Sequence, residues 1–416
     1  MRRCRWLSAG AWVCNAFHVT RRFSSGARVR ATPWLAPDAA AVVAAFAARQ
    51  PLVSRVHAPI QPTPLVTMPA LATMLGLHGG GLLVKDEGHR MGLQAFKGLG
   101  VSFAVHQLLA RLGRSQDGTV LCTMTDGNHG RAVAHVARKH NCSAVIFVPQ
   151  SMVPARRAAI EAEGARVVVV PGSYDDAIAQ MREEAAAHGW HIVSDTAWEG
   201  YEDVPADIVA GYGTMFREVE EQWRTGKAHG PITHVVLQAG VGSFASAGAA
   251  WLEMRRSERQ GDDDLQVWAP GVKLVVVEPT DADCVMENAR VGTTVSANLV
   301  PCTGQTESIM AGLNCGMPST MAWPVLRDTA TVFCSVGDEW ARQAMRRMRD
   351  EGVVAGESGA AGVAALLALQ QGAADIVHGR QGSTINLTPD STVLVINTEA
   401  DTDPEAYAAI VEVDSE

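Results

Sequence analysis

Six short apolar runs, each separated from the next by longer segments of helical character, constrain the fold of this chain most. Strands that are apolar along their whole length are buried on both faces, which is typical of parallel sheets covered by helices. We therefore predict an α/β fold with doubly wound, mostly parallel sheets. The expected strands are TVLCTM (119–124), SAVIFV (143–148), ARVVVV (165–170), THVVLQ (233–238), KLVVVE (273–278) and TVLVIN (392–397). The expected helices lie at 130–140, 154–163, 174–188, 206–224, 243–258, 338–351 and 358–371.

Bulk composition narrows the class of protein. The 416 residues are 47% hydrophobic and 19% charged, which suits a soluble globular chain of about two domains. The formal net charge of −9 argues against nucleic-acid binding, which needs a basic face. No apolar run approaches membrane-spanning length, so we predict no transmembrane helix. The eight cysteines lack zinc-type spacing, so we expect reduced thiols and no metal site.

The first residues differ from the rest of the chain. Residues 1–37 hold seven arginines and no acid, a composition typical of organellar import sequences. We predict that residues 1–30 are a mitochondrial presequence. The alternative is a disordered basic tail without a targeting role, which would leave the protein cytoplasmic.

One lysine stands in unusual surroundings. Lys97 lies in GLQAFKGLG (92–100), directly after Phe96 and among glycines and apolar residues, with no acid beside it. A desolvated amine has a lowered pKa and becomes a nucleophile that forms Schiff bases. The alternative is a surface lysine whose stem covers a groove, and this stretch alone favours that alternative.

Three loops follow expected strands, at the sheet edge where ligands bind in open α/β folds. TDGNHG (125–130) places Asn128 among glycines ahead of a helix; its alternative interpretation is a simple turn with a helix cap. AGVGSFASAG (239–248) is a glycine-rich strand-to-helix loop, of the kind that binds phosphate through N–H groups. TEADTDP (398–404) begins with the hydroxyl of Thr398.

The glycine-rich loop also raises the alternative of a nicotinamide enzyme. Gly240, Gly242 and Ala245 satisfy the GxGxxG/A dinucleotide pattern. That pattern requires an acid about 20 residues further on, whereas Glu278, at the end of the next expected strand, lies well beyond this spacing. We therefore interpret the loop as a site for a single phosphate.

Together these features match one cofactor. A buried amine suits an aldehyde, the glycine-rich loop a phosphate, Asn128 a ring oxygen and Thr398 a ring nitrogen. Those are the groups of pyridoxal 5'-phosphate, and this agreement favours a reactive role for Lys97.

The sequence also resembles the fold type II pyridoxal phosphate enzymes, and within them the diaminopropionate ammonia-lyases. The motifs run in the family's order from about residue 55 onward. They are VKDEGHRMGLQAFKGLG (84–100), TDGNHGRAVA (125–134), DTAWEGYEDVP (195–205), GYGTM (211–215), LQAGVGS (237–243), MAGLNCG (310–316), GESGAAG (356–362) and NTEADTDP (397–404).

This resemblance implies a two-domain organisation and a set of site residues. A small mobile domain at 100–205 would be inserted in a large cofactor-binding domain at 31–99 and 206–416, and the chain would form a homodimer. Lys97 would bind the cofactor and take the Cα proton of the L isomer, with Phe96 beside it. Asn128 would bind the ring oxygen and Thr398 the ring nitrogen. Gly240, Val241, Gly242 and Ser243 would bind the phosphate.

Two acids carry the substrate argument. The resemblance assigns Asp126 and Asp195 to the β-ammonium group, whose burial without a counter-charge is costly, and Asp126 to the Cα proton of the D isomer. The alternative for Asp195 is a helix N-cap. We expect His129 to have a supporting role, and Glu357 and Ser358 to cap a helix near the ring.

The predicted function is β-elimination of 2,3-diaminopropionate, in its D and L forms, to pyruvate and two ammonia. A serine/threonine dehydratase on the same scaffold is the main alternative. A NAD-dependent dehydrogenase and a non-catalytic binding protein are weaker ones.

Overall fold

The computed structural model describes residues 37–113, 118–125, 127–171, 174–226, 230–258, 266–379 and 384–412. The presequence predicted at residues 1–30 and the predicted catalytic acid Asp126 both lie outside the described residues. Of the helices inside these ranges, none has the length and hydropathy needed to cross a bilayer.

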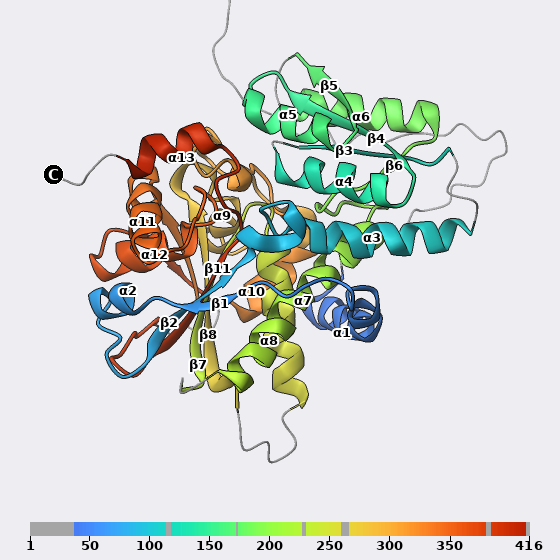
Figure 1. The fold of residues 1–416 in the computed structure, drawn as a ribbon. Coiled ribbons are helices and arrows are strands. Elements are labelled where there is room, and N and C mark those ends of the chain that lie inside the picture. The colour runs from blue at the N-terminus through green and yellow to red at the C-terminus, as the bar shows by residue number, and fades with distance from the viewer. Residues whose placement is uncertain are drawn as a thin grey trace, which may run out of the picture. The chain divides into compact units, whose positions relative to one another are not determined.

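The larger of two sheets has seven strands and is mostly parallel (Figure 1). Its edge strands β1 and β10 run antiparallel to their neighbours, and its five inner strands are parallel. The strand order is β1 (Leu65–Thr67), β2 (Gly81–Asp86), β11 (Thr392–Asn397), β7 (Ile232–Gln238), β8 (Trp268–Pro279), β9 (Val332–Val336) and β10 (Asp375–His378).

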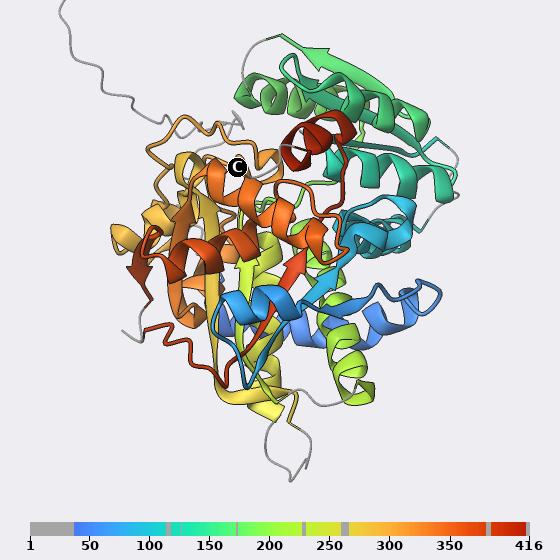
Figure 2. The same cartoon turned by 60° about the vertical axis from the view of Figure 1, so that its left-hand side comes forward.

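Helices cover both faces of this sheet (Figures 1 and 2). Side chains of each strand alternate between two hydrophobic clusters, so Leu82 and Val84 face one cluster and Leu83 faces the other. The first cluster includes α2 (Pro69–Met74), α11 (Asp338–Asp350), α12 (Ala361–Gln370) and α13 (Pro404–Val411). The second includes α1 (Ala39–Val56), α7 (Asp203–Thr225), α8 (Ser243–Glu258), α9 (Cys284–Arg290) and α10 (Ala322–Thr329).

The second sheet has four parallel strands drawn from one stretch of sequence. They are β5 (Arg166–Val170), β4 (Ser143–Pro149), β3 (Val120–Met124) and β6 (His191–Ile192). One face packs on α6 (Tyr174–His188), where Cys122 and Phe147 meet Met181. The opposite face packs on α4 (Asn128–Lys139) and α5 (Pro154–Ala162), as Figure 1 shows for α4 and α6.

The lysine helix α3 (Lys97–Leu112) lies against α7 and α4, and so connects the two sheets. Glycine permits its close approach to α7. A Cβ atom on Gly100 would lie 2.7 Å from side-chain atoms of both Ile208 and Tyr212, closer than real Cβ contacts allow. The glycines after Lys97 therefore fix the position of the first turn of α3.

These sheets confirm the predicted fold class of two doubly wound, mostly parallel sheets. All six predicted strands and seven predicted helices are present, with ends shifted by a few residues. The helix predicted at 358–371 begins at Ala361 and its N-cap is Ala360, so the prediction that Glu357 and Ser358 cap it is wrong.

Leu35–Glu416 forms a single compact unit, and the domain boundaries remain a proposal. The short 3-10 helices are η1 (Glu87–Gly92), η2 (Thr280–Ala282), η3 (Ser296–Asn298) and η4 (Ala311–Leu313).

Candidate active site

The centre of the candidate site is an ion pair between Lys97 and Asp195. Lys97 begins α3, and its Nζ lies 2.5 Å from Oδ2 of Asp195, in the loop between β6 and α7. The two side chains are 20% and 15% exposed. Because α7 begins only at Asp203, Asp195 is not its N-cap, and its carboxylate instead compensates the charge of the lysine.

This pair corrects the expectation that the pKa of Lys97 falls. Burial does lower the pKa of Lys97, but the Asp195 carboxylate and, to a smaller degree, Tyr212 raise it above its usual value. Burial raises the pKa of Asp195, whereas the Lys97 ammonium lowers it to about 2. Lys97 is therefore charged in this structure, and it must lose a proton before it acts as a nucleophile.

The glycine-rich loop at 240–243 joins β7 to α8, next to this ion pair. Ser243 Oγ donates a hydrogen bond of 2.5 Å to the backbone carbonyl of Asp195. Gly242 has a φ of +87°, which favours glycine. Gly240 has no room for a side chain, because a Cβ atom there would lie 2.9 Å from Cys315 Sγ.

Backbone N–H groups of this loop are free to bind an anion. Within the described part of the chain, the backbone N–H groups of Gly240, Val241 and Gly242 donate no hydrogen bond. The first turn of α8 adds further N–H groups and the positive end of the helix dipole. Val241 is fixed from its other side, because its carbonyl accepts a hydrogen bond from Ser319 N at 2.8 Å. These features fit a phosphate group.

Thr398 lies at the end of β11 and is bonded to the residue before Lys97. The N–H of Phe96 donates to the carbonyl of Thr398 at 3.1 Å. The hydroxyl oxygen of Thr398 accepts a hydrogen bond of 2.9 Å from Gln238 Nε2, and the hydroxyl donates a long hydrogen bond of 3.5 Å to the carbonyl of Ser358. Because that donated bond is long and weak, the hydroxyl can turn its hydrogen to an unprotonated ring nitrogen, so this residue also fits pyridoxal phosphate.

The ring of Phe96 packs between the side chain of Lys97 and two other aromatic rings, and these three rings form the aromatic wall of the site. Its ring centroid lies 4.8 Å from those of Tyr212 and Phe244, and Lys97 Nζ lies 5.3 Å from the Phe96 ring centroid. Phe244 comes from the first turn of α8, so the wall connects the lysine helix, α7 and the glycine-rich loop. The ring of Phe96 is buried at 7% exposure, and its packing contributes to the rigidity of the site.

Asn128 begins α4 and reaches across to an acid that sequence reasoning missed. Its Nδ2 donates to Oε2 of Glu399, and the other carboxylate oxygen of Glu399 accepts from Ser358 N at 3.1 Å. Glu399 is 3% exposed. The available signal was its position directly after Thr398 at the end of a buried strand.

His129 is buried beside the ion pair. Its Nε2 lies 2.8 Å from the carbonyl of Val193, so that nitrogen carries the hydrogen. Burial lowers the pKa of His129, the Asp195 charge raises it and the Lys97 charge lowers it, with a net lowering. The imidazole is therefore neutral, and it links α4 to the segment just before Asp195.

The loop ahead of α4 is held by one hydroxyl. Thr125 Oγ1 accepts from the N–H groups of Gly127 at 3.0 Å and Gly130 at 3.1 Å. Asp126 itself lies outside the described residues, and its contacts stay a prediction. The structure thus brings together Lys97, Asp195, the glycine-rich loop and Thr398, with Asn128 facing Glu399.

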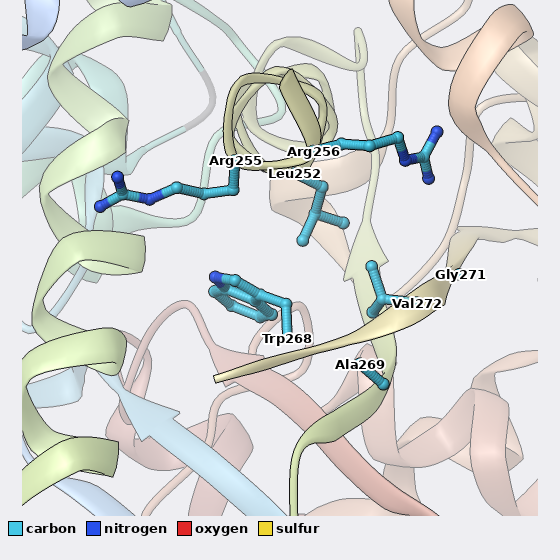
Figure 3. A pocket seen from close by; sticks show the side chains of 7 residues that line it. All are labelled: Leu252, Arg255, Arg256, Trp268, Ala269, Gly271 and Val272. Atoms are coloured by element: carbon cyan, nitrogen blue, oxygen red, sulfur yellow. The ribbon is translucent and has the colours of Figure 1, made fainter. Parts of the chain in front are cut away.

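A small hollow elsewhere is unrelated to this site (Figure 3). It lies between the end of α8 and the start of β8, and Figure 3 shows Arg255 and Arg256 extending away from it in opposite directions. Arg255 lies 12 residues after Ser243 on α8, about 18 Å along the helix axis. Its lining is Leu252, Arg255, Arg256, Trp268, Ala269, Gly271 and Val272, none of them a predicted site residue.

Comparison with protein families agrees with the cofactor that this geometry fits. The family model of pyridoxal-phosphate dependent enzymes matches residues 56–378. This chain belongs to that family.

Individual relatives narrow the assignment. The chain is 36% identical over 374 residues to diaminopropionate ammonia-lyase from Escherichia coli (strain K12), covering 84% of this chain and 87% of the relative. The crystal structure of the holo form of the Escherichia coli enzyme matches with a TM-score of 0.74 and 34% identity, over 88% of this chain and 92% of that one. Its complex with an aminoacrylate–pyridoxal phosphate azomethine intermediate matches with a TM-score of 0.73 and 35% identity, over 89% and 91%. Within the family, the chain groups with the diaminopropionate ammonia-lyases, which are carbon–nitrogen lyases.

Proposed function

We propose that this chain eliminates ammonia from 2,3-diaminopropionate, in both its D and L forms, to give pyruvate and a second ammonia. The observation that carries the proposal is the partly buried Lys97–Asp195 pair beside the loop of free N–H groups. When bound, pyridoxal phosphate supplies an aldehyde for the substrate amine and an electron sink for the bond broken at Cα.

Lys97 and Asp195 have complementary roles in this proposal. The Lys97 amine, once its proton is lost, takes the Cα proton of the L isomer. Asp195 holds the β-ammonium group of the substrate and keeps the leaving nitrogen protonated. The Cα–H bond and the Cβ–N bond break, ammonia leaves, and the released enamine is hydrolysed to pyruvate and ammonia. For the D isomer we propose Asp126 as the base on the opposite face.

Other residues position the reacting groups. The proposed cofactor ligands are Asn128 for the ring oxygen, Thr398 for the ring nitrogen, and Gly240, Val241, Gly242 and Ser243 for the phosphate, with Phe96 packed against Lys97. A small domain at 100–205 would close over the substrate and exclude water.

A substrate comparison tests the proposal. We expect the kcat/KM of the purified holoenzyme to be at least about tenfold higher for 2,3-diaminopropionate than for serine or threonine, because an acid binds the extra ammonium group. Pyruvate and ammonia should appear in a ratio of one to two. A higher kcat/KM for serine or threonine would instead identify a dehydratase.

We also propose a homodimer that works in mitochondria. The arginine-rich, acid-free residues 1–30 support import, and the family resemblance supports the dimer. Light scattering of the purified protein gives its mass directly. Cell fractionation of the full chain, with a variant lacking residues 1–30 as control, tests the location, and a cytosolic full chain would contradict it.

A further inference from the structure

Gln238 is a buried glutamine whose amide reaches across to the neighbouring strand β11. It is the last residue of β7 and is 1% exposed. Its Nε2 lies 3.0 Å from the carbonyl oxygens of Ser358 and Ile396 and 2.9 Å from the hydroxyl oxygen of Thr398. Because β7 and β11 are parallel neighbours, this amide lies at the same sheet edge as Thr398.

The orientation of this amide is fixed by its neighbours. Two of the three are backbone carbonyls, which only accept hydrogen bonds, so the NH₂ group of Gln238 must face them. If the amide turned over, its oxygen would face the carbonyl oxygens of Ser358 and Ile396. Gln238 Oε1 is buried, and no donor among the described residues reaches it. The contacts of the NH₂ group therefore outweigh the cost of an unsatisfied oxygen.

This orientation determines what the hydroxyl of Thr398 does. An amide NH₂ group donates and does not accept, so the hydrogen of the Thr398 hydroxyl cannot point to Gln238. Its one other polar contact among the described residues is the long 3.5 Å bond to the Ser358 carbonyl. A hydroxyl that accepts one hydrogen bond is polarised and donates more strongly to the next group. Thr398 is thus prepared as a donor to a ligand.

We propose that Gln238 is a positioning residue, whose NH₂ group keeps Thr398 as a hydrogen-bond donor to the ring nitrogen of the cofactor and so keeps that nitrogen unprotonated. A protonated nitrogen would instead need an acceptor there. Among the described residues, no carboxylate bonds to the side chain of Thr398 or Gln238, so a charged ring would lack a direct counter-charge.

The consequence concerns the strength of the electron sink. An unprotonated ring draws less electron density from Cα of the substrate, and such tuning of the cofactor is a task of the protein. The inference rests on the proposed assignment of Thr398 to the ring nitrogen, and it needs no particular substrate.

The test observes the ring nitrogen directly by NMR. Apoenzyme is loaded with pyridoxal phosphate that carries nitrogen-15 in its ring, because the chemical shift of this atom distinguishes its protonated and unprotonated forms. The wild type should give the unprotonated signal at neutral pH. Gln238→Glu presents an oxygen to Thr398 and reverses their hydrogen bond. We expect the ratio of protonated to unprotonated nitrogen to rise about tenfold or more, the value of one hydrogen bond to a charged group.

A second variant and a matched control accompany this measurement. Gln238→Met removes the hydrogen bond without reversing it and should give a smaller rise in the same direction. It carries the test if Gln238→Glu does not retain cofactor. Gln50→Met is the control, because Gln50 also donates to two backbone carbonyls, those of Phe46 at 3.3 Å and Ala210 at 3.2 Å. This variant should keep the wild-type signal.

Thr398→Val separates the inference from the assignment on which it rests. A signal that changes in Thr398→Val but in neither Gln238 variant would overturn the role of Gln238 and keep Thr398 at the ring nitrogen. An unchanged signal in Thr398→Val, or a protonated nitrogen in the wild type, would overturn both. No substrate is present in these samples, so failure of the proposed elimination reaction remains distinguishable.

Discussion

Lys97 Nζ lies 2.5 Å from Asp195 Oδ2, although the two residues are 98 positions apart in the sequence. The same acid residue is joined through its backbone carbonyl to Ser243 in the glycine-rich loop. One residue therefore couples the Lys97 amine to the glycine-rich loop at 240–243.

We expect Asp195→Asn to lower kcat/KM for 2,3-diaminopropionate by about 10²–10⁴, the range for loss of a general acid or base. The amide keeps the shape of the side chain but removes the counter-charge of Lys97 and the carboxylate that we propose holds the leaving nitrogen protonated. Steady-state kinetics at saturating cofactor measures the change.

Asp203→Asn is the matched control for that variant, because the side chain of Asp203, the first residue of α7, is exposed. It should retain wild-type rates. Equal activity of Asp195→Asn and the wild type would contradict the assigned role of Asp195.

Gly240→Ala should weaken cofactor binding by about tenfold or more. Its new Cβ would lie 2.9 Å from Cys315 Sγ, and the shift needed to relieve that contact displaces the N–H groups around the phosphate. Titration of apoenzyme with pyridoxal phosphate gives the Kd. Gly337→Ala is the control, since a Cβ there meets nothing within 4 Å; equal affinities in the two variants would place the phosphate elsewhere.

Glu357→Gln should change how stability depends on pH. The folded-state pKa of about 7 is above the usual 4.5, because of burial and then Glu399. Folding thus favours the protonated form of Glu357. Its contribution to the free energy of unfolding is complete below about pH 4.5 and is lost as pH rises through 7.

The wild type should therefore lose about 2–3 kcal/mol of unfolding free energy between pH 5 and 8.5 relative to Glu357→Gln. Thermal melting of apoenzyme at several pH values measures the difference, with Glu405→Gln on the exposed first turn of α13 as control. Parallel pH profiles for the wild type and Glu357→Gln would show that Glu357 does not titrate in this range.

Local patterns were enough to predict most of the central strands and the loops that follow them, because those strands are apolar on both faces. Strand β2 was missed because its sequence ends in Lys85 and Asp86, which read as surface residues. In the structure Lys85 is buried, with its Nζ 2.6 Å from Glu218. Hydropathy alone could not predict this strand, because the burial of Lys85 depends on an ion pair with a residue far away in the sequence.

The site was predicted as a set of residue types rather than as a set of contacts. Lys97 has apolar neighbours along the chain, and from these neighbours we predicted that its pKa is lowered. The fold instead places Asp195 against it, and the pKa is raised. Glu399 was missed for the same reason, because its partner Asn128 is 271 positions away. Pairings of this kind depend on packing that no local pattern records.

The most direct test of the whole account is to locate the cofactor's covalent partner. The chain has five lysines: Lys85, Lys97, Lys139, Lys227 and Lys273. Holoenzyme reduced with borohydride, digested and analysed by mass spectrometry should carry the pyridoxyl group on Lys97 alone. A label on another lysine, such as buried Lys85, or an unlabelled Lys97 in fully loaded enzyme would contradict the account.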